Sequence, residues 1–229
     1  MNKLPPITKN LLIINVLCWM GTMALAKYGI DVHKLLGLHF FLAPGFRLWQ
    51  LVTYMFLHEG FQHIFFNMFA VWMFGQVMEN QWGSKRFLFF YLICGIGAGL
   101  TQELCQFVHY EFIFSNYEVV AIDGLKMPMM QYLDQILTVG ASGAVYGILL
   151  GYGMTFPDNQ LFIIPFPFPI KAKWLITGYI VLELVLGLRN SAADNVAHFA
   201  HLGGMLAGFI VLLYWKHKER KDNHIKFTW

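Results

Sequence analysis

Charged residues are scarce in this chain of 229 residues: Asp, Glu, Lys and Arg together make up only 13%, against 57% hydrophobic residues. A soluble domain of this size with so few charges would expose large apolar patches, so the composition argues against a soluble protein. Cysteine is also rare, and Cys18, Cys94 and Cys105 form no Cys-x-x-Cys pair, so we expect small buried side chains rather than a disulfide or zinc site. The net charge is only +3, with basic residues scattered or beside apolar runs, which gives no nucleic-acid footprint.

Long apolar runs recur along the whole chain, many of them near the ~20 residues that cross a hydrocarbon core as a helix. They predict an all-α membrane protein with six transmembrane helices in one membrane domain, residues 1–229. The predicted helices cover residues 10–27, 60–81, 86–107, 136–156, 172–188 and 195–216. The proline-rich segment 156–173 cannot be helical throughout, so we expect a connection there.

The basic residues favour one orientation of these helices. Most of the 16 lysines and arginines, including those of a basic tail at residues 217–229, fall on the inner side if the N-terminus is cytoplasmic. The positive-inside rule therefore predicts both termini in the cytoplasm. Residues 33–57 contain Pro44, Gly45, Trp49 and Tyr54 but no clean span, which predicts a large outer loop lying in the membrane interface after the first helix.

Polar side chains within the spans gather at the starts of the second, fourth and sixth predicted helices. A polar side chain in hydrocarbon is costly unless it is paired or reaches water, so such clusters indicate function. The polar side chains are His58, His63 and Asn67 in the first cluster, Ser142 in the second, and His198 and His201 in the third. Because the three helices should run in the same direction, Ser142 and His201 would each lie on the order of 9 Å along their helices. The clusters then share one layer, with water admitted from the outer face.

Glycine spacing predicts that two of these helices touch. Small residues four apart let helix backbones approach closely in lipid. Such stripes are Gly143, Gly147 and Gly151 on the fourth helix, and Gly204 and Gly208 on the sixth. Ordinary packing is the alternative, since Gly95 and Gly99 show the same spacing with no catalytic candidate beside them.

A serine and a histidine at one depth suggest nucleophilic catalysis. A serine hydroxyl needs a base to take its proton, and a histidine suits that task near neutral pH. The backbone N–H of Ser142 at a helix start, with the side chains of His63 and Asn67, would bind a developing oxyanion. Tyr146, one turn beyond Ser142, would pack on the His201 ring.

We expect a dyad without an acidic third member. Asp194 lies near the mouth of the sixth helix and Glu183 deep in the fifth, so neither is obviously placed to reach the histidine.

A metal or haem site is the competing interpretation of the histidines. His58, His63, His198 and His201 could all be ligands, but His58 and His63 are five apart and should point away from each other on a helix. A zinc protease helix instead carries its histidines four apart. We therefore expect no metal and no cofactor.

Three separate motifs resemble those of the rhomboid family of intramembrane serine proteases, over roughly residues 58–208. They are Gly140, Ser142, Gly143 and Tyr146; Ala200, His201, Gly204 and Gly208; and His58, His63 and Asn67. The resemblance implies a six-helix rhomboid-like bundle with Ser142 as nucleophile and His201 as general base. It also implies an oxyanion and substrate-binding site at His63, Asn67, Ser142 and Gly140, supported by Tyr146, Gly143, Gly204, Gly208 and His198. His201 is preferred to His198 as base because only His201 has glycines three and seven residues later.

The resemblance further implies the substrates and the location. It implies cleavage of single-pass transmembrane proteins near the outer end of their span, without a cofactor, by an integral multi-pass protein of a bacterial cytoplasmic membrane. Glu79 resembles a structural glutamate of the family. A non-catalytic rhomboid-like module that binds membrane helices for quality control is the alternative, and the presence of both Ser142 and His201 argues against it.

Two features depart from the family pattern. The outer loop reads Phe46-Arg47-Leu48-Trp49, so the usual Trp-Arg pair is not intact, and the connection at residues 108–135 is long. They bear on loop structure and substrate choice rather than on the dyad.

Overall fold

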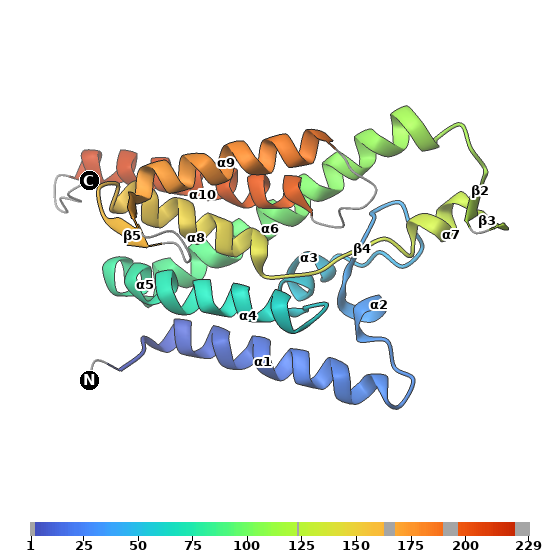
Figure 1. Ribbon diagram of the computed structural model, residues 1–229, viewed down its shortest axis with the longest axis horizontal. Coiled ribbons are helices and arrows are strands. Elements are labelled where there is room, and N and C mark those ends of the chain that lie inside the picture. Colours follow the sequence, from blue (N-terminus) through green and yellow to red (C-terminus); the bar gives the residue numbers. More distant parts are fainter. Residues whose placement is uncertain (1–2, 123, 163–167, 190–196, 223–229) are drawn as a thin grey trace.

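Most of the backbone is helical in the computed structural model, which describes residues 3–122, 124–162, 168–189 and 197–222. The long helical stretches lie side by side along the long axis of the molecule (Figure 1). They are α1 (Pro6–Ala26); α4 (Phe61–Ala70) with the π-turn η2 (Val71–Gly75) and α5 (Gln76–Trp82); α6 (Ser84–His109) with the π-turn η3 (Tyr110–Phe114); α8 (Ser142–Thr155); α9 (Ala172–Arg189); and α10 (His198–Asp222). Helices α4, α8 and α10 run in the same direction, as the orientation argument expects.

Helix α1 begins four residues earlier than predicted, at Pro6. Proline is tolerated in a first helical turn, where its missing N–H has no helical partner to lose. The other donors of this turn bind a side chain from α5: Glu79 accepts hydrogen bonds from the Ile7 N–H at 2.9 Å and the Thr8 N–H at 2.7 Å. The Ser84 hydroxyl at the start of α6 also donates to Glu79, at 2.6 Å. One buried carboxylate therefore joins three helices at this end of the bundle.

Helix α8 is short and central. It has 14 residues, most of them buried between α6, α9 and α10, and it begins partway along the bundle (Figure 1). The predicted start at residue 136 is wrong, because residues before Ser142 form strand β4 (Leu137–Thr138), paired with β1 (Leu38–His39). Gly140 then turns the chain with a φ of 132°, a conformation that favours glycine. Ser142 is consequently the first residue of its helix and does not lie ~9 Å along it.

Helix α6 is longer than its predicted range of 86–107. It begins at Ser84 and continues through η3 to Phe114. His109 and Glu111 lower the hydrophobicity beyond the predicted end at residue 107. Gln106 and His109 line a cavity, where a polar side chain meets water rather than lipid.

At the end of the bundle opposite the start of α1, which we call the outer end after the predicted orientation, the segments between the helices form the outer cap, residues 32–57, 115–122 and 124–138. Its elements are α2 (Val32–Leu36), β1, α3 (Gln50–Thr53), the 3₁₀ turn η1 (Tyr54–Phe56), β2 (Val119–Ile122), β3 (Leu125–Pro128), α7 (Met129–Leu133) and β4. Asp134 connects its two parts, since its Oδ1 accepts from the Gly45 N–H at 2.7 Å and lies 3.1 Å from His39 Nδ1. Phe40, Ala43, Met129 and Leu133 form a small buried cluster within the cap.

The connection after α8 is not helical where the structure describes it. Strands β5 (Gln160–Phe162) and β6 (Pro169–Lys171) pair antiparallel, as the proline-rich segment suggests. The predicted tail at residues 217–229 begins too early, because α10 continues to Asp222. Residues 195–196 of the sixth predicted helix and residues 223–229 of the tail lie outside the described part.

Three of the described helices are long and apolar enough to cross a membrane: Pro6–Ala26, Ser84–Phe114 and His198–Lys221. The fold is thus that of a mostly helical membrane protein, and the count of six spans stays a prediction. Helix α8 falls short because its 14 residues extend only ~21 Å. Helix α9 carries Lys173, Glu183 and Arg189 within its 18 residues.

Candidate active site

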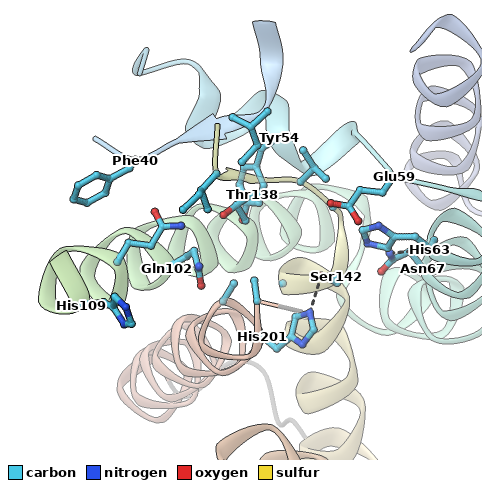
Figure 2. Close-up of a pocket in the computed structure, with 18 of the residues that line it drawn as sticks. Phe40, Tyr54, Glu59, His63, Asn67, Gln102, His109, Thr138, Ser142 and His201 are labelled. Carbon is cyan, nitrogen blue, oxygen red and sulfur yellow. Dashed lines mark hydrogen bonds between the residues drawn. The ribbon is translucent and has the colours of Figure 1, made fainter. Parts of the chain in front are cut away.

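Ser142 and His201 meet at the outer end of the contact between α8 and α10. The His201 Nε2 and the Ser142 Oγ are 2.8 Å apart, the distance of a hydrogen bond (Figure 2). Ser142 lies at the first position of α8, so its N–H is outside the helical hydrogen-bond ladder. His201 lies in the first turn of α10 and is only 7% exposed.

The glycines of both helices allow this approach. A Cβ atom added to Gly204 would lie 2.0 Å from the carbonyl oxygen of Gly143, so the two backbones are in direct contact. A Cβ on Gly143 would lie 2.3 Å from the Cβ of Ala98, and one on Gly208 would lie 2.9 Å from the Phe90 ring, both on α6. Because these positions are glycines, helices α6, α8 and α10 pack closer together than any side chain would allow. The close packing of α8 against α10 sets the Ser142–His201 distance.

A carboxylate lies on the other side of His201. Glu183 of α9 places its Oε2 3.0 Å from His201 Nδ1 and 2.6 Å from His198 Nδ1. Its Oε1 accepts a hydrogen bond from the Tyr146 hydroxyl. The Tyr146 ring stacks on the His201 ring, with centroids 4.2 Å apart and an interplanar angle of 11°. The expectation that no acidic residue reaches this histidine is therefore wrong.

The sequence contained a signal for Glu183 that our reasoning missed. An ionisable residue in the middle of an apolar helix is costly and needs a partner in the bundle. The sequence places Glu183 deep in the fifth predicted helix, where our prediction assigns it no partner. Helix α9 and the first turn of α10 are consecutive along the chain and pack against each other. Two histidines at the start of α10 were thus within reach of a carboxylate on α9.

His63 and Asn67 of α4 line the same pocket as Ser142 (Figure 2). His63 lies against Gly140, where an added Cβ would come within 2.7 Å of the His63 Nε2. The Asn67 side-chain N–H donates to the His63 carbonyl at 2.9 Å, which leaves its second amide hydrogen for another acceptor. The structure thus brings these side chains to one pocket, and what they do in a reaction stays a prediction.

A cavity of about 1030 Å³ opens over Ser142 and His201. Its walls come from α4, α6, α10 and the outer cap, and Gln102 and His109 of α6 face His63 and Asn67 across it (Figure 2). Gln62, Gln106, Thr138 and Tyr132 add further polar groups to its lining. A cavity of this size with several polar side chains in its lining has room for ordered water and for an extended peptide segment.

The geometry changes the argument about a metal site. His58 precedes α4 and is not on the helix, and its ring lies edge-on to His63 with centroids 4.9 Å apart, so these rings do not point away from each other as expected. Glu183, His198 and His201 form another group, with potential ligand atoms within 4.8 Å of one another. The hydrogen bonds among those three already account for their closeness.

Comparison with known proteins gives a matching family and several relatives. The family model of the Rhomboid domain matches residues 45–218. Rhomboid protease GluP of Bacillus subtilis is 29% identical over 164 residues, which are 70% of this chain and 25% of that protein. Rhomboid protease AarA of Providencia stuartii is 28% identical over 181 residues, 76% of this chain and 59% of that protein.

A further relative is rhomboid protease GlpG of Yersinia pseudotuberculosis, which is 25% identical over 169 residues, 74% of this chain and 48% of that protein. The chain thus spans from a quarter to about three fifths of the length of these relatives.

Proposed function

This chain belongs to the rhomboid family, and from this premise we propose that it is an intramembrane serine endopeptidase with Ser142 as nucleophile and His201 as general base. The observation that carries the proposal is the 2.8 Å contact between Ser142 Oγ and His201 Nε2, both of which line a cavity that also contains other polar side chains. Several relatives are named as rhomboid proteases, which supports the same reaction class.

The first half of the reaction forms an acyl-enzyme. His201 Nε2 takes the proton of the Ser142 hydroxyl as its Oγ attacks the carbonyl carbon of the scissile peptide bond. The tetrahedral intermediate then collapses, and the protonated His201 gives that proton to the leaving amine. Ser142 is left esterified to the new C-terminal residue of the amino-side fragment.

The oxyanion of the tetrahedral intermediate needs hydrogen-bond donors. The Ser142 N–H at the start of α8 is one, and the positive end of the α8 dipole lies at the same place. The side chains of His63 and Asn67 are the further donors that we propose, and Gly140 leaves the room for a substrate carbonyl beside them.

Water completes the reaction from the cavity. His201 takes a proton from a water molecule, the resulting hydroxide attacks the ester carbonyl, and Ser142 Oγ leaves with that proton restored. The glutamine and histidine side chains of α4 and α6 can hold water here, in a layer that lipid would otherwise keep dry.

We propose that the substrates are single-pass transmembrane proteins, cleaved near the outer end of their span, and that the bundle crosses a bacterial cytoplasmic membrane six times. The start of α1 and the end of α10 lie at one end of the bundle (Figure 1), which supports both termini on the same side of the membrane, and the positive-inside rule is our reason for proposing the cytoplasmic side. The site then opens toward the outer face, at the opposite end from Glu79.

The test is cleavage of a reporter single-pass substrate in proteoliposomes. Ser142→Ala should lower the rate by at least about 10³-fold because no other nucleophile replaces the hydroxyl. Ser115→Ala is the matched control, since Ser115 is exposed at the end of η3 and its hydroxyl donates to the backbone carbonyl of Glu111. Undiminished cleavage by folded Ser142→Ala protein would refute the proposal.

A fluorophosphonate probe separates this enzyme from a non-catalytic helix-binding module. An activated serine reacts with the probe, so we expect labelling of wild-type protein that disappears in Ser142→Ala and His201→Ala. A binding module would bind transmembrane segments with no labelling at Ser142.

A further inference from the structure

Glu183 has surroundings that the dyad mechanism does not use. Its side chain is buried in α9, with the residue only 4% exposed. It hydrogen-bonds to the side chains of His198, His201 and Tyr146, and the Tyr146 and His201 rings stack on each other. One of these partners is thus the proposed base, and the rings of the other two contact the ring of that base.

The hydrogen bond to Glu183 selects one tautomer of His201. An ionised carboxylate only accepts hydrogen bonds, so the proton of a neutral His201 must lie on Nδ1, which faces Glu183. The lone pair then lies on Nε2, which faces the Ser142 hydroxyl. In the opposite tautomer, Nε2–H would donate to the Ser142 Oγ and could not accept its proton, and the lone pair of Nδ1 would face the carboxylate with no hydrogen between them.

The same contact supplies charge when His201 becomes protonated. Transfer of the Ser142 proton to Nε2 makes an imidazolium, and a carboxylate oxygen lies 3.0 Å from its other nitrogen. A charge that forms in a water-poor helix bundle is costly without such a partner, and here the partner is in place before the reaction.

Glu183 also fixes the plane of the His201 ring. Its Oε1 holds the Tyr146 hydroxyl, and Tyr146 lies flat on the imidazole at 4.2 Å between centroids. One carboxylate thus restrains His201 along its edge through Nδ1 and across its face through Tyr146.

Resting on the proposed function, we propose that Glu183 is a positioning residue that completes a Ser142–His201–Glu183 triad in this chain. It sets the tautomer of His201 and balances the imidazolium, and it touches no substrate atom.

Glu79 illustrates the contrast with a structural carboxylate. It is equally buried, at 2% exposure, but its partners are two backbone N–H groups and two hydroxyls that do not titrate near neutral pH. Glu183 instead faces two imidazoles and a phenol, the groups whose proton positions matter in acid–base catalysis.

The experiment compares Glu183→Gln, Glu183→Ala and Glu183→Asp with the control Glu103→Gln, using the full chain in proteoliposomes. Glu103 is a buried glutamate of α6 that accepts the Phe41 N–H of the outer cap at 2.7 Å, away from His201. We expect kcat to fall by about 10²–10⁴-fold in Glu183→Gln and Glu183→Ala, with KM within about twofold of wild type. Glu183→Asp should recover part of kcat, and Glu103→Gln should keep it.

A spectroscopic readout separates positioning from a merely structural role. Nitrogen NMR of the histidine side chains should show His201 protonated on Nδ1 in the wild type and a mixture of tautomers in Glu183→Gln. The proposal would be overturned if kcat in the Glu183 variants fell only in proportion to the fraction of folded protein while the tautomer of His201 stayed unchanged.

Three further outcomes separate the triad proposal from the dyad protease, from failure of the proposed function and from a metal site. If wild-type protein cleaves substrate, Ser142→Ala does not, and Glu183→Gln retains wild-type kcat, then the triad is wrong and the dyad protease stands. If wild-type protein shows no Ser142-dependent cleavage, the proposed function itself fails. A strong chelator should leave kcat unchanged, whereas a loss that zinc restores would make Glu183, His198 and His201 a metal site and overturn the positioning role.

Discussion

Beneath Ser142, helices α8 and α10 touch backbone to backbone, whereas the two parts of the outer cap are joined by the short β1–β4 pair, a small apolar cluster and the side-chain contacts of Asp134. The first kind of contact tolerates no added atom, because the neighbour at Gly204 is the Gly143 carbonyl itself. Apart from the β1–β4 pair, the contacts of the outer cap involve side chains and can be removed one side chain at a time. We infer that the inner bundle, the packed helices α1, α4–α6 and α8–α10, fixes the distance between Ser142 and His201. The outer cap then governs which substrate segments reach these two residues.

The largest effect should come from Gly204→Val. Its Cβ would lie 2.0 Å from the Gly143 carbonyl oxygen, so α8 and α10 must separate and the Ser142–His201 contact must break. We expect a loss of at least about 3 kcal/mol of stability, measured by thermal unfolding in detergent, together with loss of cleavage.

Gly178→Ala on α9 is the control for this substitution, since no neighbouring atom lies within 4 Å of an added Cβ there. It should unfold like the wild type. A Gly204→Val protein with wild-type stability and rate would show that backbone contact does not set the site.

A smaller effect should follow from Glu79→Ala, at the far end of the inner bundle. The substitution leaves the donors of Ile7, Thr8 and Ser84 without their acceptor, which we expect to cost about 2–4 kcal/mol. The kcat per folded molecule should not change, because this end contains no reacting group.

Glu79→Gln keeps an acceptor oxygen in place and should recover part of the stability in the same thermal unfolding assay. If fully folded Glu79→Ala protein had a lower kcat, then the two ends of the bundle would be coupled. Glu79 would then affect catalysis as Glu183 does, and the contrast between a structural and a positioning carboxylate would not hold.

The smallest effect should come from Asp134→Ala in the outer cap. It removes the acceptor of the Gly45 N–H and the partner of His39, which is worth about 1–2 kcal/mol locally because the side chain is partly exposed. We expect KM for a transmembrane substrate to rise severalfold while kcat stays constant, as measured by steady-state cleavage.

Glu118→Ala is the matched control, since it removes an exposed carboxylate from the same part of the outer cap as Asp134. Both kinetic constants should then match the wild type. A fall in kcat with unchanged KM in Asp134→Ala would instead place the cap within the catalytic machinery.

Much of the architecture could be predicted from the sequence because apolar runs and glycine spacing are local features. A helix occurs at each predicted place, and the family and the helical membrane character are confirmed. The start of α8 could not be predicted in this way, since it depends on β4 pairing with β1, about 100 residues away in the chain. Hydropathy continues smoothly across residues 136–141 and does not show that break.

The candidate site was predicted in part for the same reason. Ser142, His201, Tyr146, His63 and Asn67 stand out because their motifs are short. The carboxylate of Glu183 carries no motif, and its contacts with α8 and α10 arise only when α9 packs beside both. A buried ion's partners depend on tertiary packing, so only the rule that a charge in a membrane helix needs a partner could have indicated it.

The shortness of α8 has a consequence for how lipids affect this protein. A helix that extends only ~21 Å, enclosed by longer neighbours, has little boundary with the acyl chains. The depth of Ser142 below the outer end of the bundle is then set by helix packing and not by the bilayer. A thicker or thinner bilayer would tilt the peripheral helices and shift the substrate span against that fixed level, so membrane thickness would decide which peptide bond arrives there.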